Sequence, residues 1–364
     1  MLNIKKPTLL LDSEICRRNI RAMAAKALEQ NVIFRPHFKT HQSAAVGEWF
    51  REEGVAAITV SSVTMAQYFA KNGWKDITIA FPVNLLEIEE INDLASGIKL
   101  HLLLESEETA KFVASKLTLE CGFFIKIDTG YHRTGIEASN VILIKKVLQA
   151  AKSSKLHFDG FLTHNGNSYH AQDKQELIHI QKNATENLLR LKKHFQPQYP
   201  NILISVGDTP TCSQLPVATG IDEIRPGNFV FYDVMQFALG SCKMEHIAVA
   251  VICPVVSVHL NRLEAVIYGG AVHLSKELAI LPPDPKPIYG LAVSWDGKNW
   301  DTANLSGMVT SLSQEHGIVS LTQQGCTLKP GDLMAILPVH SCLTADLMKK
   351  YMTLDGDEIE MMNL

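Results

Sequence analysis

Strand-like and helix-like segments alternate along the first two thirds of the chain, and this alternation constrains the fold most. Eight runs rich in β-branched and other apolar residues are separated by helical or mixed segments; they span 31–36, 55–60, 76–80, 98–104, 122–128, 157–163, 201–206 and 222–225. Eight βα units are the number that closes a (β/α)8 barrel, although a doubly wound open sheet gives a similar alternation. No GxGxxG motif follows the first run and no Walker lysine is present, which argues against a nucleotide-binding open sheet. We therefore predict an α/β fold built on a (β/α)8 TIM barrel.

The composition changes after about Gly240, where short β-branched runs broken by Gly and Pro replace the alternation. The run from Ala248 to Val258 is typical of them and indicates a second, mostly β domain. Residues 7–12 form a short strand-like run before the first helix, and we expect it to pair with this second domain. The predicted division is a barrel over 13–242 and a β domain made of 1–12 and 243–364.

Charge and hydropathy point to a small-molecule partner. The 364 residues are 46% hydrophobic and carry a net charge of only -4, with Lys and Arg dispersed, so the basic footprint expected for nucleic acid or an anionic membrane surface is missing. The sequence shows no apolar signal core and no membrane-spanning run, and we expect a cytoplasmic protein. The seven cysteines contain no CxxC pair and are expected to be mostly buried, reduced thiols.

A lysine between two histidines marks the end of the first strand-like run. Lys39 lies between His37 and His41, and a lysine whose pKa is lowered by burial or by cationic neighbours can form a Schiff base. A solvated surface charge explains the pentapeptide alone equally well.

Other polar residues also cluster at strand ends. The loops after the fifth to eighth runs carry the side chains or backbone amides Asp128, Tyr131, His132, Arg133, His164, Asn165, Asn167, Tyr169, Ser205, Gly207, Asp208, Thr209, Arg225, Gly227 and Asn228. Barrel enzymes build their active sites at the C-terminal ends of the strands, and the loops after the last two strands commonly bind phosphate. Each loop alone reads as an ordinary turn. Their convergence on one barrel face indicates a phosphate-binding site opposite Lys39.

On these residues the chain resembles the fold-type III pyridoxal phosphate (PLP) enzymes related to alanine racemase, in the branch of D-serine dehydratase and D-threonine aldolase. The motifs that carry the resemblance are 35–41, 128–135, 164–169, 223–228, 313–317 and 338–342. The resemblance implies that Lys39 holds PLP as a Schiff base and removes the Cα proton. It places Arg133 near the ring oxygen, and His164 and Tyr169 beside the ring. It assigns the phosphate to Ser205, Gly207, Thr209, Gly227 and Asn228.

A His-x-Cys motif provides a candidate metal site. In an extended segment residues two apart point the same way, so His340 and Cys342 can bind one ion. Thiolate with imidazole favours Zn²⁺, with Mn²⁺ as a possible substitute. Taken alone, such a pair is more often a core thiol beside a histidine. The resemblance assigns the metal to this motif, and a cysteine here is more similar to the dehydratases than to aldolases with a carboxylate.

The resemblance implies a PLP- and zinc-dependent lyase that acts on D-3-hydroxy amino acids. Dehydration of D-serine to pyruvate and ammonia is favoured: Lys39 takes the α-proton and the metal helps the β-hydroxyl to leave. D-threonine aldolase, which yields glycine and an aldehyde, is the alternative. An amino-acid racemase would need a second base, typically a partner tyrosine, and Tyr268 and Tyr289 lack an alanine racemase motif. A non-enzymatic PLP carrier fits the β domain poorly.

The roles of two positions, and with them the identity of the substrate, are not decided by the sequence. The family architecture implies a homodimer. Tyr268 stands where the family usually has an aspartate before glycine, and with His273 it either fills a turn or reshapes the substrate pocket. His316 is predicted either as an acid-base group near the metal or as the cap of a turn. The sequence does not choose among D-serine, D-threonine and 3-hydroxyaspartate.

Overall fold

The computed structural model describes residues 2–281, 284 and 286–363. The chain forms two compact units that do not follow the sequence continuously. The barrel unit contains Met23–Lys39 and Phe50–Gly227, and the β unit contains the stretch ending at Ala22 together with Thr40–Trp49 and Asn228–Asn363. Helices α1 (Ser13–Glu29) and α2 (Ala44–Glu52) each contribute residues to both units.

The barrel unit contains eight parallel strands in the order β2-β10-β9-β8-β6-β5-β4-β3. They are β2 (Ile33–Phe34), β3 (Ile58–Val60), β4 (Asp76–Pro82), β5 (Lys99–Leu104), β6 (Cys121–Asp128), β8 (Leu156–Leu162), β9 (Leu203–Val206) and β10 (Glu223–Ile224), with β7 (Ile136–Glu137) paired to β6. A parallel bridge between His37 and Thr59 joins the two ends of the order. The predicted barrel with its eight strands is confirmed.

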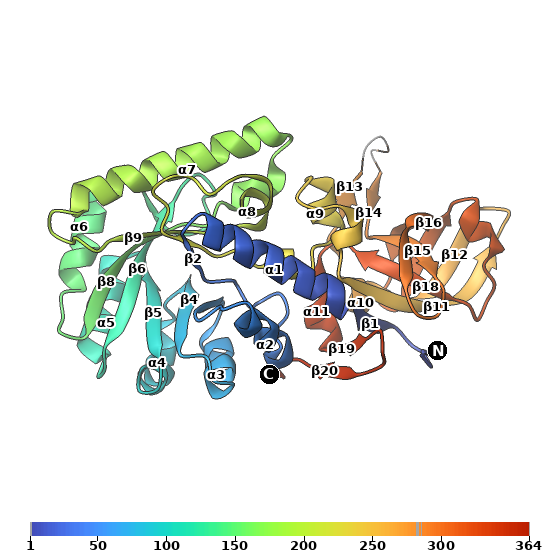
Figure 1. The fold of residues 1–364 in the computed structure, drawn as a ribbon, viewed down its shortest axis with the longest axis horizontal. Helices are drawn as coiled ribbons and strands as arrows, with labels where there is room; N and C mark the ends of the chain where they lie inside the picture. Colours follow the sequence, from blue (N-terminus) through green and yellow to red (C-terminus); the bar gives the residue numbers. More distant parts are fainter. Residues whose placement is uncertain (1, 282–283, 285, 364) are drawn as a thin grey trace. The chain divides into compact units, whose positions relative to one another are not determined.

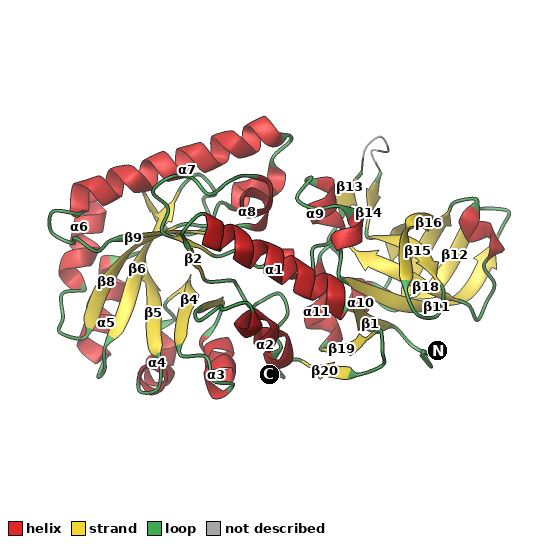
Figure 2. Ribbon diagram, viewed as in Figure 1, coloured by secondary structure: helices red, strands yellow, loops and turns green. Residues whose placement is uncertain are grey.

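Helices follow the strands and lie outside them, as Figures 1 and 2 show for α4, α5 and α6 beside their strands. The helices of this unit are α3 (Val63–Lys71), α4 (Ile88–Ala95), α5 (Glu107–Lys116), α6 (Val141–Ala150), α7 (Lys174–Phe195) and α8 (Thr209–Gln214), with 3-10 turns η1 (Leu85–Glu87) and η2 (Gly166–His170). Side-chain caps from Ser62, Ser106 and Asp173 start α3, α5 and α7 by accepting bonds from backbone amides. These caps fix where each of the three helices begins, and so define the end of the loop that precedes it.

The β unit is built on a nine-stranded sheet in the order β12-β17-β16-β15-β18-β11-β1-β19-β20. An additional pairing of β12 with β11 closes the first six strands on themselves. The strands are β1 (Thr8–Leu11), β11 (Val249–His259), β12 (Glu264–Tyr268), β15 (Gly290–Trp295), β16 (Trp300–Leu312), β17 (His316–Leu321), β18 (Leu333–Pro338), β19 (Lys350–Thr353) and β20 (Glu358–Glu360). β13 (Ala279–Ile280) and β14 (Pro287–Ile288) form a separate pair.

The N-terminal strand pairs within the β unit, as the sequence predicts. β1 runs antiparallel to β11 and parallel to β19, and Leu9, Leu10 and Leu11 are fully or almost fully buried. The helical elements of this unit are α9 (Val234–Ala238), α10 (Ala271–Leu274), α11 (Ser341–Met348), η3 (Asn228–Val230), η4 (Met244–His246) and η5 (Gln324–Thr327). Among the residues that the structure describes, no helix is both long and apolar enough to cross a membrane.

Candidate functional site

An aromatic cluster fixes the strand end that carries Lys39. Phe38 is completely buried, and its ring packs against Phe50, Phe69 and Trp74 with centroid separations of 4.9, 4.9 and 5.0 Å. Phe38 and Lys39 lie in the turn that follows the β-bridge at His37. With Phe38 anchored in the core, Lys39 is exposed, which leaves its amine accessible to a carbonyl compound.

A row of rings and one guanidinium lies on the loops after β6 and β8. The Arg133 guanidinium carbon is 5.1 Å from the centroid of the Tyr131 ring, and this ring is 6.0 Å from that of His164. The His164 and Tyr169 rings are 6.1 Å apart. A Cβ atom on Gly166 would lie 2.3 Å from the Tyr131 ring, so only glycine admits this packing. Three predicted cofactor-binding residues, Arg133, His164 and Tyr169, are thereby brought together.

His164 is a neutral imidazole in positive surroundings. Its Nδ1 is 2.5 Å from the Gly207 carbonyl oxygen, so Nδ1 carries the proton and donates. Burial, together with the positive charges of Lys39, Arg133 and Lys126, lowers the pKa of His164 to about 3 against the opposite effect of this hydrogen bond. Positive charge concentrated around one neutral ring favours an anionic ligand such as a phosphate or a carboxylate.

The loop after β9 contributes a buried hydroxyl and a close backbone approach. The Thr209 hydroxyl is buried and has no hydrogen-bond partner within the described part of the chain, while its backbone amide donates to the Tyr169 hydroxyl at 3.3 Å. A Cβ atom on Gly207 would lie 2.8 Å from Cβ of Arg225, so this position also requires glycine. An accessible lysine, a neutral histidine, nearby cations and an unsatisfied hydroxyl fit PLP.

Ser205 has hydrogen-bond partners inside the barrel unit. Its hydroxyl is fully buried, donates to the Glu223 carboxylate at 2.6 Å, and accepts from Nε of Arg225 at 2.6 Å. Arg225 also donates to the Thr163 carbonyl at 2.5 Å. Ser205 therefore links Glu223 to Arg225, and the predicted bond from its hydroxyl to the phosphate stays a prediction.

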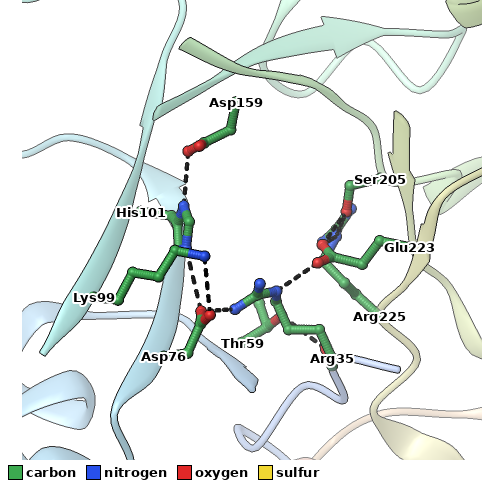
Figure 3. Close-up of polar contacts among 9 residues, drawn as sticks. All are labelled: Arg35, Thr59, Asp76, Lys99, His101, Asp159, Ser205, Glu223 and Arg225. Atoms are coloured by element: carbon green, nitrogen blue, oxygen red, sulfur yellow. Dashed lines mark hydrogen bonds and ion pairs between the residues drawn. The ribbon is translucent and has the colours of Figure 1, made fainter. Parts of the chain in front are cut away.

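The same network continues across the strands of the barrel unit (Figure 3). Nε of Arg35 donates to Glu223 at 2.6 Å, and the guanidinium also pairs with Asp76. His101 bridges Asp76 at 3.2 Å and Asp159 at 2.7 Å. Each member follows or lies in a different strand, so the network ties β2, β4, β5, β8 and β10 together.

Lys126 is a charged residue of the site that sequence reasoning did not identify. It lies on β6, is 6% exposed, and donates to the Ile127 carbonyl at 3.1 Å. Burial lowers its pKa to about 7, helped by the positive charges of Arg225 and Arg133. The sequence feature that could have identified it is a single lysine in an otherwise apolar strand, on the same face of the strand as Phe124 and Asp128.

His340 and Cys342 lie at the junction of β18 and α11. His340 is extended and Ser341 begins the helix, so the prediction of a continuous extended segment is wrong. The pair still interacts, because the first helical turn folds the thiol back. Burial disfavours the charged imidazole, but the hydrogen bond and negative charge of Cys342, with Asp233 and Glu277, raise the pKa of His340 to about 9.

The donor atoms of this motif fit a borderline-soft ion. Nδ1 of His340 is buried and has no hydrogen-bond partner among the described residues, and the Cys342 sulfur is 3.2 Å from the Thr40 hydroxyl. No cluster of three or more His, Cys, Asp or Glu side chains suited to a metal occurs where the structure is described. The site therefore offers one imidazole and one thiol, a set that suits Zn²⁺ when other ligands complete the shell.

The remaining predicted residues lie as follows. His316 is exposed and begins β17; its carbonyl accepts from the Ser313 amide at 2.9 Å and closes the turn. Its acid-base role near the metal stays a prediction. Tyr268 stacks edge-on with His273 at 5.6 Å. Asn228 is buried beside Ser341 and Cys342, and Gly227 is buried in the barrel unit.

Comparison with known proteins gives two family matches. The family model "Alanine racemase, N-terminal domain" matches residues 11–234, and the model "Putative serine dehydratase domain" matches residues 248–354. The first covers more than half of the chain. The two matches together include every predicted site residue.

Individual relatives match over different lengths. D-serine dehydratase of Dictyostelium discoideum is 29% identical over 98% of this chain and 94% of its own length. D-threo-3-hydroxyaspartate dehydratase of Delftia sp. is 27% identical over 98% and 96%. A solved metal-free variant of a D-threo-3-hydroxyaspartate dehydratase, with one cysteine replaced by alanine, has a TM-score of 0.91 at 25% identity and covers 100% of this chain and 98% of that one. The 3-hydroxy-D-aspartate aldolase of Paracoccus denitrificans is 28% identical over 46% of this chain and 44% of its own.

Proposed function

The chain belongs to the family of the alanine racemase N-terminal domain, within the fold-type III PLP enzymes of the D-serine dehydratase branch, and we propose that it dehydrates D-3-hydroxy amino acids. D-Serine is the proposed main substrate, with pyruvate and ammonia as products. The observation that carries the proposal is the Lys39 strand end, with His164, Arg133 and Thr209, in a chain that also has the His340 and Cys342 pair.

The length of the matches supports dehydration over aldol cleavage. Both dehydratase relatives match 98% of this chain and therefore include the β unit with its metal motif. The aldolase matches cover 45% to 64% of the chain. An enzyme that removes a β-hydroxyl group needs a group that assists its departure, which the metal motif would supply. Aldol cleavage to glycine and an aldehyde is the second candidate.

The residues of the chain take distinct roles in the proposed reaction. PLP, when bound, would supply an electron sink for the negative charge that forms at Cα. Lys39 holds the cofactor and then takes the α-proton. His164, kept neutral by burial and nearby cations, packs against the ring without adding charge. Arg133, and Lys126 in its protonated form, provide positive charge for the anionic cofactor and the substrate carboxylate.

His340 and Cys342 would hold Zn²⁺. The ion would act as a Lewis acid on the β-hydroxyl of the substrate. The metal-free cysteine variant of the related dehydratase supports a role for a cysteine in metal binding in that enzyme. Replacement of Zn²⁺ by Mn²⁺ is a weaker alternative, because thiolate is a poor ligand for manganese.

A product assay tests the reaction. The purified protein, loaded with PLP, is incubated with D-serine, D-threonine and D-threo-3-hydroxyaspartate, with and without a chelator. We expect the corresponding keto acid from D-serine, and a loss of turnover with the chelator that Zn²⁺ restores. Glycine as the main product would change the assigned reaction from dehydration to aldol cleavage. Turnover unaffected by complete metal removal would overturn the proposed role of the metal.

Replacement of the proposed Schiff-base lysine tests the central assignment. Lys39→Ala should abolish the visible absorbance of bound PLP and reduce turnover by several orders of magnitude, because the covalent link and the base are both lost. Lys145→Ala, at an exposed position on α6, is the control and should retain both. Absorbance that persists in Lys39→Ala and disappears in Lys126→Ala would move the link to the second lysine.

We propose a homodimer as the assembly. Exposed apolar side chains on the contacting helices α10 and α11 support it: Val272, Leu343 and Leu347 are 40%, 39% and 43% exposed, and apolar side chains grouped on a surface are typical of protein–protein contacts. Sedimentation velocity at micromolar concentration tests the assembly, and a monomer there would contradict it. The cytoplasmic location expected from the sequence stays a prediction.

A further inference from the structure

One carboxylate is buried inside the β unit next to the metal motif. Asp233 is 1% exposed and is the only buried Asp, Glu, Lys or Arg among the residues of this unit that the structure describes. Its Oδ2 atom accepts from the Ser341 amide at 2.9 Å and from the Ser341 hydroxyl at 3.2 Å. Ser341 is the residue between His340 and Cys342, so Asp233 binds the centre of the motif.

Asn228 adds a second contact to the same turn. Its side-chain Nδ2 donates to Oδ2 of Asp233 at 2.6 Å, lies 3.1 Å from the Ser341 hydroxyl, and lies 3.6 Å from the Cys342 sulfur. An ionised carboxylate only accepts, so the atom of Asn228 that faces Asp233 must be the amide nitrogen. The orientation of the amide is thereby fixed.

The other end of the Asn228 amide has no partner. Oδ1 of Asn228 is buried and accepts no hydrogen bond within the described part of the chain, and Nδ1 of His340 is in the same condition. Buried polar atoms are nearly always satisfied in folded proteins. One of these atoms belongs to the His-x-Cys motif and the other to a residue that contacts the motif, and together they point to a ligand that binds there.

We propose that Asp233 and Asn228 are positioning residues for the metal pair His340 and Cys342. Asp233 holds the turn so that the imidazole and the thiol face one ion, and Asn228 donates to the Cys342 sulfur and fixes its position. The inference rests on the proposed function, since it assumes that the motif binds a metal. A site with only two protein ligands depends strongly on such support, because few other bonds orient its donors.

Replacement of the carboxylate tests the first role. Asp233 Oδ1 accepts from the Gln236 amide at 2.9 Å and caps α9, so in Asp233→Asn the new NH2 group must face either the Ser341 and Asn228 donors or the Gln236 amide, and Asp233 no longer holds both the motif and the start of α9. We expect Zn²⁺ affinity, measured by competition with a chromogenic chelator on the PLP-loaded protein, to fall about 10–100-fold. Affinity equal to that of the wild type would overturn the role of Asp233.

The chain offers a matched control for this variant. Asp12 accepts from the Ile15 amide at 2.9 Å at the start of α1, so it also caps a helix by a carboxylate in the β unit, and it has no contact with the motif. Asp12→Asn should lower thermal stability without changing Zn²⁺ affinity. Equal losses of affinity in both variants would show a general effect of capping and would also overturn the proposal.

Asn228→Leu tests the contact of Asn228 with the Cys342 sulfur. It also provides a test of the proposal if Asp233→Asn does not fold. Leucine keeps the approximate shape and removes both polar ends. With Co²⁺ as the probe, the thiolate-to-cobalt charge-transfer absorbance should weaken or shift in this variant. The PLP content is measured in the same samples, because the resemblance also assigns Asn228 to the phosphate, and the cobalt spectrum is compared at equal PLP content. An unchanged cobalt spectrum at saturation would exclude an effect on the sulfur.

The outcomes separate this inference from the proposed function. A wild-type protein that binds neither Zn²⁺ nor Co²⁺ would refute the metal part of the proposed function. A wild-type protein that binds both ions, with variants indistinguishable from it, would refute only the positioning roles of Asp233 and Asn228.

Discussion

The two units use opposite kinds of interior. The barrel unit buries Arg35, Glu223 and Arg225 at 3%, 0% and 4% exposure and pairs them with one another and with Asp76 and His101 (Figure 3). The β unit fills its strands with aliphatic side chains and buries one carboxylate, Asp233, among the residues described. Arg35, Glu223 and Arg225 form one connected network inside the barrel unit, whereas the buried carboxylate of the β unit contacts only its local turns.

The difference shows which interactions fix the arrangement of the strands in each unit. A buried ion network fixes the relative positions of strands, since a charge left without its partner is costly. Aliphatic packing tolerates changes of shape better, since its energy depends mainly on volume and buried area. The barrel unit should therefore respond sharply to loss of one charge, and the β unit only weakly to loss of one methyl group.

The largest effect is expected from Glu223→Gln. Glu223 is fully buried between Arg35 and Ser205, and its neutralisation leaves the Arg35 and Arg225 charges without full compensation. We expect the free energy of unfolding to fall by about 3–5 kcal/mol, measured by denaturant titration. A loss below about 1 kcal/mol would mean that the network is not the main constraint on the barrel unit.

A smaller effect, visible in its pH dependence, is expected from His101→Gln. Burial lowers the pKa of His101, but hydrogen bonds to Asp159 and Asp76 outweigh burial and raise it above its usual value. A raised folded-state pKa stabilises the protein below the unfolded-state pKa of about 6.5, and this stabilisation is lost as pH rises through the folded value. The wild type should lose stability across that range.

The glutamine variant should lack this decline and should be less stable than the wild type at pH 6. Thermal unfolding at a series of pH values measures both effects. His157→Gln is a suitable control, because this histidine is exposed and only loosely paired with Glu120 at 3.6 Å. An identical pH profile in wild type and His101→Gln would show that His101 does not take up a proton on folding.

The smallest effect is expected from Ile252→Val in the β unit. Ile252 lies on β11, is completely buried, and pairs with Thr8 and Ala335 in the neighbouring strands. Removal of one methylene group should cost about 0.5–1.5 kcal/mol, measured under the same denaturant conditions as Glu223→Gln. A cost equal to that of Glu223→Gln would remove the contrast between the two interiors.

The sequence predicts the strand ends well, because apolar periodicity and turn residues are local signals. The runs ending at Asp128, Thr163 and Val206 match β6, β8 and β9 within a residue or so. The strand before residue 13 could also be paired with the β domain in advance, since residues 7–12 are apolar and precede the first helix. Local sequence patterns were therefore sufficient to predict where these strands lie and that the N-terminal strand pairs with the β domain.

Side-chain partners across the sheet could not be predicted in the same way. Arg35 and Glu223 are 188 positions apart, and their contact depends on the register of β2 against β10. In the sequence, Lys126 is one charged residue in an apolar run, and only the folded barrel shows that its side chain is buried. Asn228 is predicted from the sequence to bind the phosphate, and only the fold shows its side-chain amide beside Cys342.

The pairing of β1 also sets an order of events during synthesis. The strand leaves the ribosome early, yet its partners begin at Val249 and Lys350. At the usual 5–20 residues per second, the apolar run Leu9–Leu11 waits on the order of tens of seconds for β11 and longer for β19. A nascent chain of this design thus carries an unpaired, aggregation-prone edge throughout the formation of the barrel unit. A chaperone that binds short leucine-rich segments near the N-terminus would have its longest opportunity there.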